Sequence, residues 1–514
     1  MELSRLISKS TMKAQSIGKK YIEGFATLEI LIAFAVVILC ISAVIMVAFS
    51  NQSLAVDMQT NIEAISKAKN VLEHARATSR QNYSLVEDCD DSGANICPGT
   101  ADPFYNRKLT IDPTSVTECG ENVISATTWN INNRALSIDL ITHLGDIATA
   151  IALGGDCVID PPTDGGPTWK NPQTFTSASI DPSGNKGTDI DVIKIGSHKY
   201  GFLTSVHPSS DKFDLWSFDL ETNPPTILDM LDTGPGLNAI DVARASDGNY
   251  YAYLANNNTI APYEQLIVIN VTDPADMNEI AGARRSLPGV AGADPAGRTI
   301  YYFNEKIYIG TRLTAGNEFH IYDVSNPASP IHMGQREVNH SIRKIIVREN
   351  SAYLATTSDS NELMVFNVSN PTSILPLWGG TGSTEPGFNA LGSENGESIF
   401  SLGNSIILGR AQTAAGRPEL YILKTNDLSA IGSVDLGLSP SSATVEDIYA
   451  VSNFIFIGTS DSNTEFQVWN KSDLSAKWSY LNFPQSITGI EYIDDKIYAS
   501  VDSNNALHII YDAP

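Results

Sequence analysis

The chain begins with a polar, basic stretch that runs directly into a continuous apolar segment. From residue 25 to residue 49 the only charged side chain is Glu29. A helix of this length spans roughly 37 Å, at about 1.5 Å per residue, which is enough to cross a bilayer. Beyond residue 50, apolar residues recur at spacings of three and four, and no Gly or Pro interrupts residues 25–80. The pattern therefore predicts one helix over 25–80 that continues past the membrane.

Alternating apolar and polar residues follow the helix in three segments, 107–111, 123–131 and 135–144. The Asn-Asn pair at 132–133 is typical of a tight turn between two antiparallel strands. We expect a small antiparallel β-layer within residues 82–158.

A Pro- and Gly-rich stretch, residues 161–172, predicts a linker, and a repeat begins after it. Three segments, 266–274, 319–327 and 363–371, share an apolar run that ends in Asn or Asp, followed by an Asn-Pro or Asp-Pro pair. Weaker copies end at Asp219, Lys424, Asn470 and Asp512. Neighbouring copies lie 42 to 57 residues apart. Several short strands per unit at this period indicate a β-propeller.

One unit of the repeat predicts four strands, over 342–348, 352–356, 363–368 and 374–378. Seven copies predict seven blades, although six or eight stay possible. The last unit ends after its third strand, and the β-like stretch 174–180 has no partner of its own. Because a closed ring leaves no open sheet edge, we expect this stretch to complete the last blade. The fold class is an α+β module followed by an all-β propeller.

The composition limits the function classes. Apolar residues make up 42% of the chain, too many for a disordered protein and too few for a polytopic membrane protein. The formal net charge is -25, which repels phosphate and argues against nucleic-acid binding by the bulk surface.

Five cysteines are present, and we expect Cys40, inside the apolar segment, to be a small buried hydrophobic residue. The others, Cys89, Cys97, Cys119 and Cys157, fall within one stretch of fewer than seventy residues. An even, clustered set in an exported segment predicts two disulfides. Sequence order favours Cys89–Cys97 with Cys119–Cys157, and the two other pairings stay open. Metal ligation is the alternative, but no CxxC and no paired histidine accompanies the cysteines.

Residues 88–93 are similar to the start of an EF-hand loop, but the twelfth position is Gly99 rather than Glu. This pattern favours a solvated acidic loop, and we predict neither a metal site nor a cofactor. Scattered histidines in the propeller region come without HExxH, GxSxG or a glycine-rich phosphate loop. We therefore expect no catalytic residues and no enzyme, with a surface enzyme tethered by the N-terminal helix as the alternative.

Two kinds of propeller loop are long, namely those between the second and third strands and those leading from the fourth strand to the next blade. In a propeller both kinds lie on one face, and long loops on a rigid scaffold are where binding usually occurs. The candidate binding residues on this face are Trp378, Phe388, Tyr263, Arg284, Arg285 and Arg298. Each is equally suited to filling the small core of its own loop.

The residues around the start of the helix resemble a known signal. The leader, 1–24, has five basic and two acidic side chains, a formal charge of +3. It ends in Gly24, followed by Phe25-Ala26-Thr27-Leu28-Glu29, which resembles the class III signal of type IV pilins and pseudopilins. The resemblance implies that a prepilin peptidase cleaves after Gly24 and that Phe25 is N-methylated. It also implies that Glu29 pairs with the N-terminal amine of a neighbouring subunit and that the β-layer packs on the helix.

Many major pilins carry a proline near the twenty-second mature position, where this chain has Met46. The chain therefore looks more like a minor pilin or minor pseudopilin. The repeat resembles LVIVD-type surface-protein repeats. The domains implied are a cleaved leader (1–24), a pilin module (25–160), a linker (161–172) and a propeller (173–514).

Taken together, these resemblances imply a type IV pilus subunit, of the minor or tip type, that displays a propeller for adhesion or surface recognition. Its partners would be the peptidase, other pilin subunits, cytoplasmic-membrane lipid before assembly, and an unidentified surface ligand. The expected location is first the cytoplasmic membrane and then the extracellular pilus. The alternatives are a pseudopilin of a type II secretion or DNA-uptake system and the major subunit of a decorated pilus.

Overall fold

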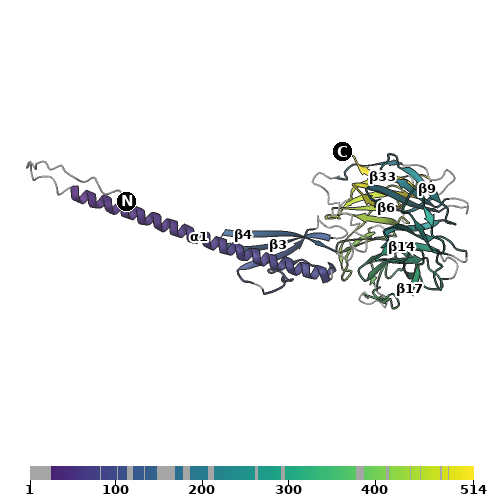
Figure 1. The fold of residues 1–514 in the computed structure, drawn as a ribbon, viewed down its shortest axis with the longest axis horizontal. Coiled ribbons are helices and arrows are strands. Elements are labelled where there is room, and N and C mark those ends of the chain that lie inside the picture. Colours follow the sequence, from purple (N-terminus) through teal and green to yellow (C-terminus); the bar gives the residue numbers. More distant parts are fainter. Residues whose placement is uncertain are drawn as a thin grey trace, which may run out of the picture.

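The computed structural model has three parts in line: a long helix, a small sheet along its second half, and a round β-domain at the far end (Figure 1). The residues it describes are 25–81, 83–100, 102–112, 120–131, 134–146, 168–176, 186–206, 213–260, 264–290, 296–377, 387–412, 416–439, 442–451, 453–474, 477–483 and 485–513.

The helix α1 (Phe25–Gln81) has 57 residues and confirms the expected helix over 25–80. Its segment Ile30–Phe49 has a mean hydropathy of 3.3 and no buried side chain, so it is long and apolar enough to cross a membrane. In the second half, Ala64, Ala68 and Val71 are buried. Small side chains at these positions let a sheet approach the helix closely.

That sheet is formed by β1 (Cys89–Asp90), β2 (Tyr105–Ile111), β3 (Gly120–Ile131) and β4 (Arg134–Gly145), in the order β1-β2-β3-β4. A short 3-10 helix, η1 (Tyr83–Leu85), connects α1 to it. All pairs are antiparallel, which confirms the expected β-layer. The expected turn at 132–133 lies outside the described residues. We call α1, η1 and this sheet the stalk.

The predicted disulfide Cys89–Cys97 is present, and both cysteines are buried in the core of the stalk. Cys119 and Cys157 lie outside the described residues, so their pairing stays a prediction. Cys40 is a free and exposed cysteine, so the expectation that it is buried is wrong for the isolated chain, in which nothing covers the apolar half of α1.

The β-domain is a propeller, and the described strands form seven blades, as the repeat predicted. Blade 1 consists of β6 (Lys186–Ile195), β7 (His198–Val206), β8 (Leu215–Asp219) and β9 (Thr226–Leu231). Blade 2 consists of β10 (Leu237–Arg244), β11 (Tyr250–Asn256), β12 (Leu266–Asn270) and β13 (Asn278–Glu279). Blade 3 consists of β14 (Gly297–Phe303), β15 (Lys306–Thr311), β16 (Phe319–Asp323) and β17 (Ile331–Arg336). Blade 4 consists of β18 (Ile342–Arg348), β19 (Ser351–Thr356), β20 (Leu363–Asn367), β21 (Leu375–Pro376) and β22 (Gly387–Phe388). Blade 5 consists of β23 (Gly396–Leu402), β24 (Ser405–Arg410), β25 (Leu420–Lys424) and β26 (Ala430–Val434). Blade 6 consists of β27 (Val445–Ala450), β28 (Phe454–Thr459), β29 (Phe466–Asn470) and β30 (Lys477–Leu481).

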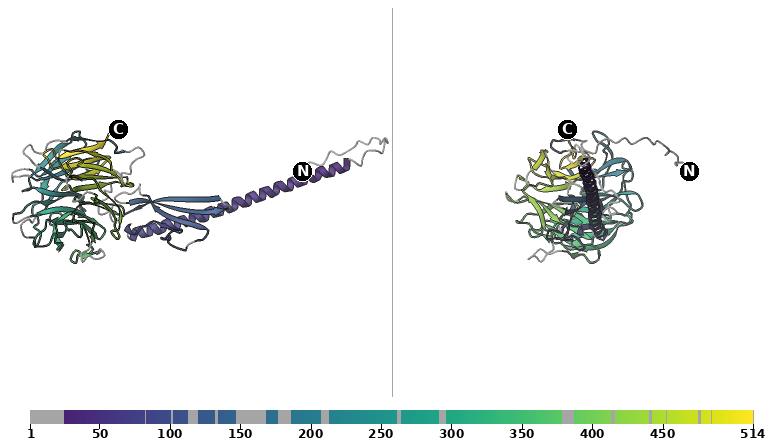
Figure 2. Two further views of the ribbon diagram at one scale, coloured as in Figure 1. Left: turned by 180° about the vertical axis from the view of Figure 1, so that it is seen from behind. Right: turned by 90° about the vertical axis from the view of Figure 1, so that its left-hand side faces the viewer.

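Blade 7 consists of β31 (Ile487–Ile493), β32 (Lys496–Val501), β33 (Leu507–Asp512) and β5 (Pro172–Thr176). Because β5 comes from the start of the domain, its pairing with β33 joins the two ends of the ring and confirms the expected closure. Viewed along the helix, the blades follow one another around the ring in sequence order (Figure 2, right).

The propeller begins earlier than the predicted boundary at residue 173. The carboxylate of Asp512 accepts hydrogen bonds from the backbone N–H groups of Thr168, Trp169 and Asn171, at 2.7, 2.7 and 3.0 Å. The Trp169 side chain is buried and packs edge-on against Phe456, with ring centroids 4.8 Å apart. Residues 168–171 of the expected linker therefore belong to the propeller.

The first strands of neighbouring blades lie side by side around the axis of the ring. Each of these strands carries a β-bulge near its start. Counted from the paired residue just before the bulge, the third residue along the strand is isoleucine in every blade. These isoleucines are Ile190, Ile240, Ile300, Ile345, Ile399, Ile448 and Ile490, and all are buried. A β-branched side chain at one fixed position fills the same space between blades each time.

The stalk contacts only one of the two propeller faces (Figures 1 and 2). On this stalk face, Arg348 pairs with Asp146 at 3.3 Å, and the side chain of Asn404 donates to the carbonyl oxygen of Val86 at 3.1 Å. The side chain of Asn426 also contacts the Glu87 carboxylate, at 2.9 Å. All three propeller residues lie in or beside the short turns of blades 4 and 5. The long loops therefore lie on the opposite face, which we call the loop face.

Candidate functional site

The loop face points away from the stalk, and the sequence placed six candidate binding residues on it. Trp378 and Tyr263 lie outside the described residues. Phe388 is half-buried, and its ring lies 5.3 Å from that of Tyr421. Phe388 therefore helps to fill a core between blades 4 and 5.

Two of the predicted arginines are engaged by their own loop and by neighbouring blades. Arg284 forms ion pairs with Glu279 at 2.6 Å and with Glu264 at 3.1 Å. The guanidinium of Arg285 donates to the backbone carbonyls of Pro330, at 2.8 Å, and Gly282, at 2.6 Å. Arg298 is different, because it lies at the start of an inner strand, where the axis of the ring opens onto the loop face. The structure therefore does not bring the described candidates into one site.

Sequence reasoning missed a set of buried polar side chains at the base of the loop face. In six blades the side chain of the residue just before the third strand accepts a hydrogen bond from a backbone N–H beyond the fourth strand. Five are carboxylates and one is an amide: Asp214, Gln265, Glu318, Glu362, Glu419 and Glu465. We call them the loop-base residues. The corresponding residue of blade 7 is Ala506.

Burial changes the acidity of the loop-base carboxylates. It raises the pKa of Asp214, Glu318 and Glu419 to about 7 in each case. The backbone N–H donors oppose this effect, since they favour the charged form. A charged or amide residue immediately before the apolar run of each repeat was the signal that could have revealed these residues.

The loop face also exposes large apolar side chains, one on each of blades 1 to 4. Phe213 is 43% exposed, Ile260 75%, Leu313 53% and Leu391 83%. Large apolar side chains are also exposed right after the short turns of the stalk face, where Ile331, Leu375 and Ile431 are 63%, 57% and 57% exposed. Single exposed apolar residues are normal on a protein surface, so they do not by themselves mark one face as a recognition surface.

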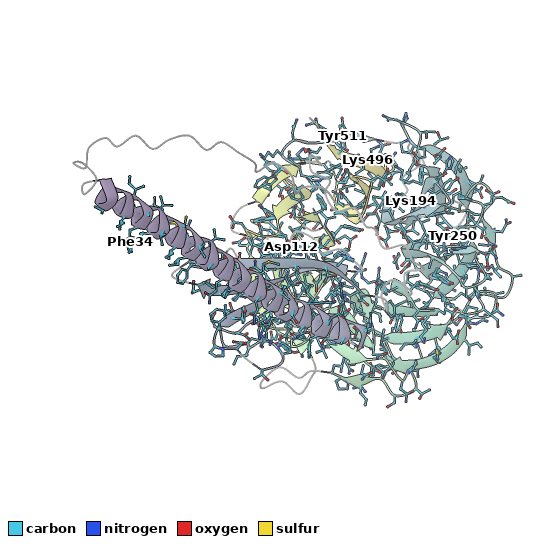
Figure 3. The ribbon with its side chains drawn as sticks, turned by 60° about the vertical axis from the view of Figure 1, so that its left-hand side comes forward. Phe34, Asp112, Lys194, Tyr250, Lys496 and Tyr511 are labelled. Atoms are coloured by element: carbon cyan, nitrogen blue, oxygen red, sulfur yellow. A yellow bond between two sulfur atoms is a disulfide. The ribbon has the colours of Figure 1, made fainter. Side chains whose placement is uncertain are left out.

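The axis of the ring encloses a cavity of about 580 Å³, lined almost entirely by the first strands of the blades. Figure 3 labels Lys194 and Tyr250, which line its end near the stalk face. Buried carboxylates in it link one blade to the next. Asp189 accepts the N–H of Ile240 at 3.2 Å, and Asp447 accepts that of Ile490 at 2.9 Å.

One lysine balances part of the negative charge in this cavity. The ammonium nitrogen of Lys344 lies 3.1 Å from Asp447 and 4.0 Å from Asp189. Burial raises the pKa of Asp189 to about 6 and that of Asp191 to about 7, and it also raises the pKa of Asp241. Each of these carboxylates is already bonded to a neighbouring blade, so the cavity is built for holding the ring together.

No group of three or more potential metal-ligating side chains occurs in the part of the chain that the structure describes. In the loop that resembles the start of an EF-hand, Asp91 forms an ion pair with Arg107 at 2.7 Å. Asp90 accepts hydrogen bonds from the backbone and hydroxyl of Ser92. These carboxylates are engaged within the stalk.

Comparisons with known proteins agree with a propeller. A sequence profile described as LVIVD repeat matches residues 308–337 and 341–375, which lie in blades 3 and 4. No curated protein matches the chain.

Several solved structures are similar at low sequence identity. They include the WD40 beta propeller domain of Doa1 (11% identity, 66% of this chain and 97% of that chain covered, TM-score 0.44) and Saccharomyces cerevisiae Sqt1 (12%, 66% and 100%, 0.42). The computationally designed Ika8 protein is also similar (10%, 65% and 99%, 0.41).

Proposed function

We propose that this protein is a type IV pilus subunit, of the minor or tip type, that displays its propeller for adhesion or surface recognition. The observation that carries the proposal is the stalk. A single helix of 57 residues combines an apolar first half with a second half covered by an antiparallel sheet. This combination follows the sequence Gly24-Phe25-Ala26-Thr27-Leu28-Glu29, which resembles a class III signal.

The apolar half of α1 needs two successive environments in this proposal. All its side chains from Ile30 to Phe49 are exposed in the isolated subunit, so lipid covers them before assembly. In the fibre, the helices of neighbouring subunits take the place of lipid. A carboxylate at position 29 is costly in lipid unless a cation accompanies it. The new amine at Phe25 of a neighbouring subunit supplies that cation after cleavage.

The arrangement of the two propeller faces supports a display function. The stalk occupies the face with short turns, so the face with long loops and exposed apolar residues points away from the helix (Figure 1). A subunit held in a fibre through α1 would therefore present its loop face to the surroundings. The propeller then acts as a binding module rather than an enzyme.

A test begins with Glu29→Gln in the full chain. The amide loses the charge that pairs with the amine of a neighbour, so we expect fewer fibres and unchanged membrane insertion. The matched control is Glu73→Gln, since Glu73 is an exposed glutamate farther along the same helix that pairs with Arg76. Electron microscopy of fibres and membrane fractionation measure the two effects.

Mass spectrometry of protein from sheared fibres provides the second measurement. We expect a mature chain that begins at a methylated Phe25. An intact Met1 terminus, or wild-type fibre numbers with Glu29→Gln, would contradict the proposal.

A further inference from the structure

The β-bulges of the inner strands place one extra residue per blade around the opening of the ring on the loop face. In three blades this residue is short and uncharged, and it bonds to the backbone of the next blade. Thr188 donates to the carbonyl oxygen of Leu237 at 2.7 Å, and Asn238 donates to that of Gly297 at 2.6 Å. Thr488 makes the same kind of bond, to Gly187 at 3.1 Å. A small polar side chain is therefore enough to link two blades at this position.

The four remaining blades carry charged residues at the same position. They are Arg298, Arg343, Glu397 and Glu446, on blades 3 to 6. Arg343 pairs with Glu397 at 3.0 Å, and Glu446 accepts a hydrogen bond from the hydroxyl of Thr444. Three of the four charged groups thus have partners within the protein.

Arg298 has no hydrogen bond or ion pair among the described residues, and its Nε atom is buried. The neighbouring hydroxyl of Thr299 is likewise buried without a hydrogen-bond partner. Burial, together with the positive charge of Arg343, lowers the pKa of Arg298 to about 10. Arg312, on the adjoining loop, adds a further positive charge to the same surroundings.

A half-buried guanidinium whose Nε atom lacks a hydrogen-bond partner is unfavourable for the free protein, and Glu397 and Glu446 offset its charge only in part. Three arginines and two glutamates lie in these surroundings, in a chain that has 33 basic residues against 58 acidic ones, so the opening is more basic than the chain as a whole. Linking the blades does not require them, since Thr or Asn performs that task in three blades. The arrangement leaves the buried Nε donor of Arg298 without an acceptor.

We infer that Arg298, flanked by Arg343, binds an oxyanion group of the ligand that the loop face recognises. The planar guanidinium presents parallel N–H donors, which match the two oxygens of a carboxylate or sulfate. Glu397 and Glu446, at the bulges of blades 5 and 6, repel a second negative charge, so the site takes one anionic group at its Arg298 side. This inference deepens the proposed recognition function and rests on it for the identity of the face.

A carboxylate and a sulfate share this chemistry, and a binding assay with one soluble probe of each kind separates them. The full chain in detergent micelles is titrated with oligogalacturonate, a heparin-derived oligosaccharide and a neutral maltooligosaccharide of equal length. We expect one of the two anionic probes to bind, with an affinity that falls as salt rises. The neutral probe should bind more weakly. Absence of binding by both anionic probes would overturn the inference.

The variants are Arg298→Gln, Arg298→Lys and, as a matched control, Arg417→Gln. Arg417 also lies on the loop face, but it is already paired with Glu394 at 3.1 Å. We expect Arg298→Gln to weaken binding of the anionic probe about ten- to hundredfold, the range for a charged hydrogen-bonded pair. Arg298→Lys keeps the positive charge but loses the two parallel N–H donors of the guanidinium, so an intermediate effect is expected. Arg417→Gln should bind as the unchanged chain does.

Thermal unfolding distinguishes a binding role from a structural one. Removing a half-buried charge that lacks a partner should leave the melting temperature of Arg298→Gln unchanged or raise it. A clear decrease, or unchanged binding by Arg298→Gln, would show that Arg298 serves the fold instead. Because the assay uses isolated protein, it can fail while fibre assembly through Glu29 succeeds, and the reverse is equally possible.

Discussion

The two faces of the propeller use similar repeats for different purposes. On the stalk face, the residue that ends the third strand turns the chain with its side chain. Asn270, Asp323 and Asn367 each accept the backbone N–H of the residue two positions later, at 2.8 to 2.9 Å. Such turns are short and alike from blade to blade. A uniform face of this kind offers a regular surface on which the stalk can dock.

The loop face keeps its regularity at the base of the loops and varies beyond it. The loop-base residues hold the chain at the same place in six blades, whatever the length of the loop above. Exposed apolar side chains and the unpartnered Arg298 lie in or beside the variable parts. The comparison teaches that fixing the ends of a loop by buried hydrogen bonds leaves its tip free to specialise.

The largest expected effect comes from opening the ring, on which both faces depend. A propeller chain that starts at Thr168 keeps β5, whereas one that starts at Lys186 loses it along with the contacts of Trp169 and Asp512. The shorter chain leaves an open edge on β33, so we expect aggregation and no cooperative unfolding. Circular dichroism on heating and light scattering compare the two. Equal melting temperatures and equal solubility would contradict closure by β5.

The second largest effect is expected from a substitution on the stalk face that leaves the loop face unchanged. Arg348 is nearly buried and bonds to Asp146 and to the Ser401 hydroxyl, the latter at 2.8 Å. Arg348→Ala leaves the buried Asp146 without its guanidinium, at a cost of about 3–5 kcal/mol. We expect a lower melting temperature and a propeller more loosely held on the stalk, measured by small-angle scattering. Lys306→Ala, on the same face of blade 3, is the control, because the Lys306 amine bonds only within its own turn.

The regular parts of the fold could be predicted from the sequence, whereas the contacts of the loop residues could not. The helix, the β-layer, the seven blades and the closure by β5 all follow from periodicity, since apolar spacing is a local signal. The binding residues were harder to predict, because a side chain on a long loop can turn outward or inward. Arg284, Arg285 and Phe388 turn inward and contact the protein itself. Their partners come from other segments, and single-residue chemistry does not reveal such pairs.

The third expected effect is more moderate and concerns pH, because the raised pKa values of the loop-base carboxylates make the stability of the propeller depend on it. Unfolded Asp and Glu titrate near pH 4, whereas Asp214, Glu318 and Glu419 titrate near 7 when folded. The folded state thus binds more protons than the unfolded state between these values. Their contribution to stability is fully present below about pH 4 and is lost as pH rises through about 7.

We therefore expect the propeller to melt several degrees higher at pH 5 than at pH 8. Glu318→Gln should reduce this dependence without unfolding blade 3, because Gln265 occupies the same position in blade 2. Calorimetry across this pH range measures both effects. A melting temperature that rises steadily from pH 5 to pH 8 would show that other groups dominate.

The smallest effect on stability is expected from the tips of the loop face, and it should have the clearest effect on function. Leu313 and Leu391 are 53% and 83% exposed, so replacing both with Ser should change the free energy of unfolding by no more than about 0.5 kcal/mol each. Aromatic, aliphatic and arginine side chains at such positions supply binding energy only when a partner covers them. Fibres that carry these two changes should form in normal numbers but adhere poorly. Asn326→Ala, in a short turn of the stalk face, is the matched control and should leave adhesion intact. If adhesion falls with Asn326→Ala alone, or with neither change, the loop face is not the recognition surface.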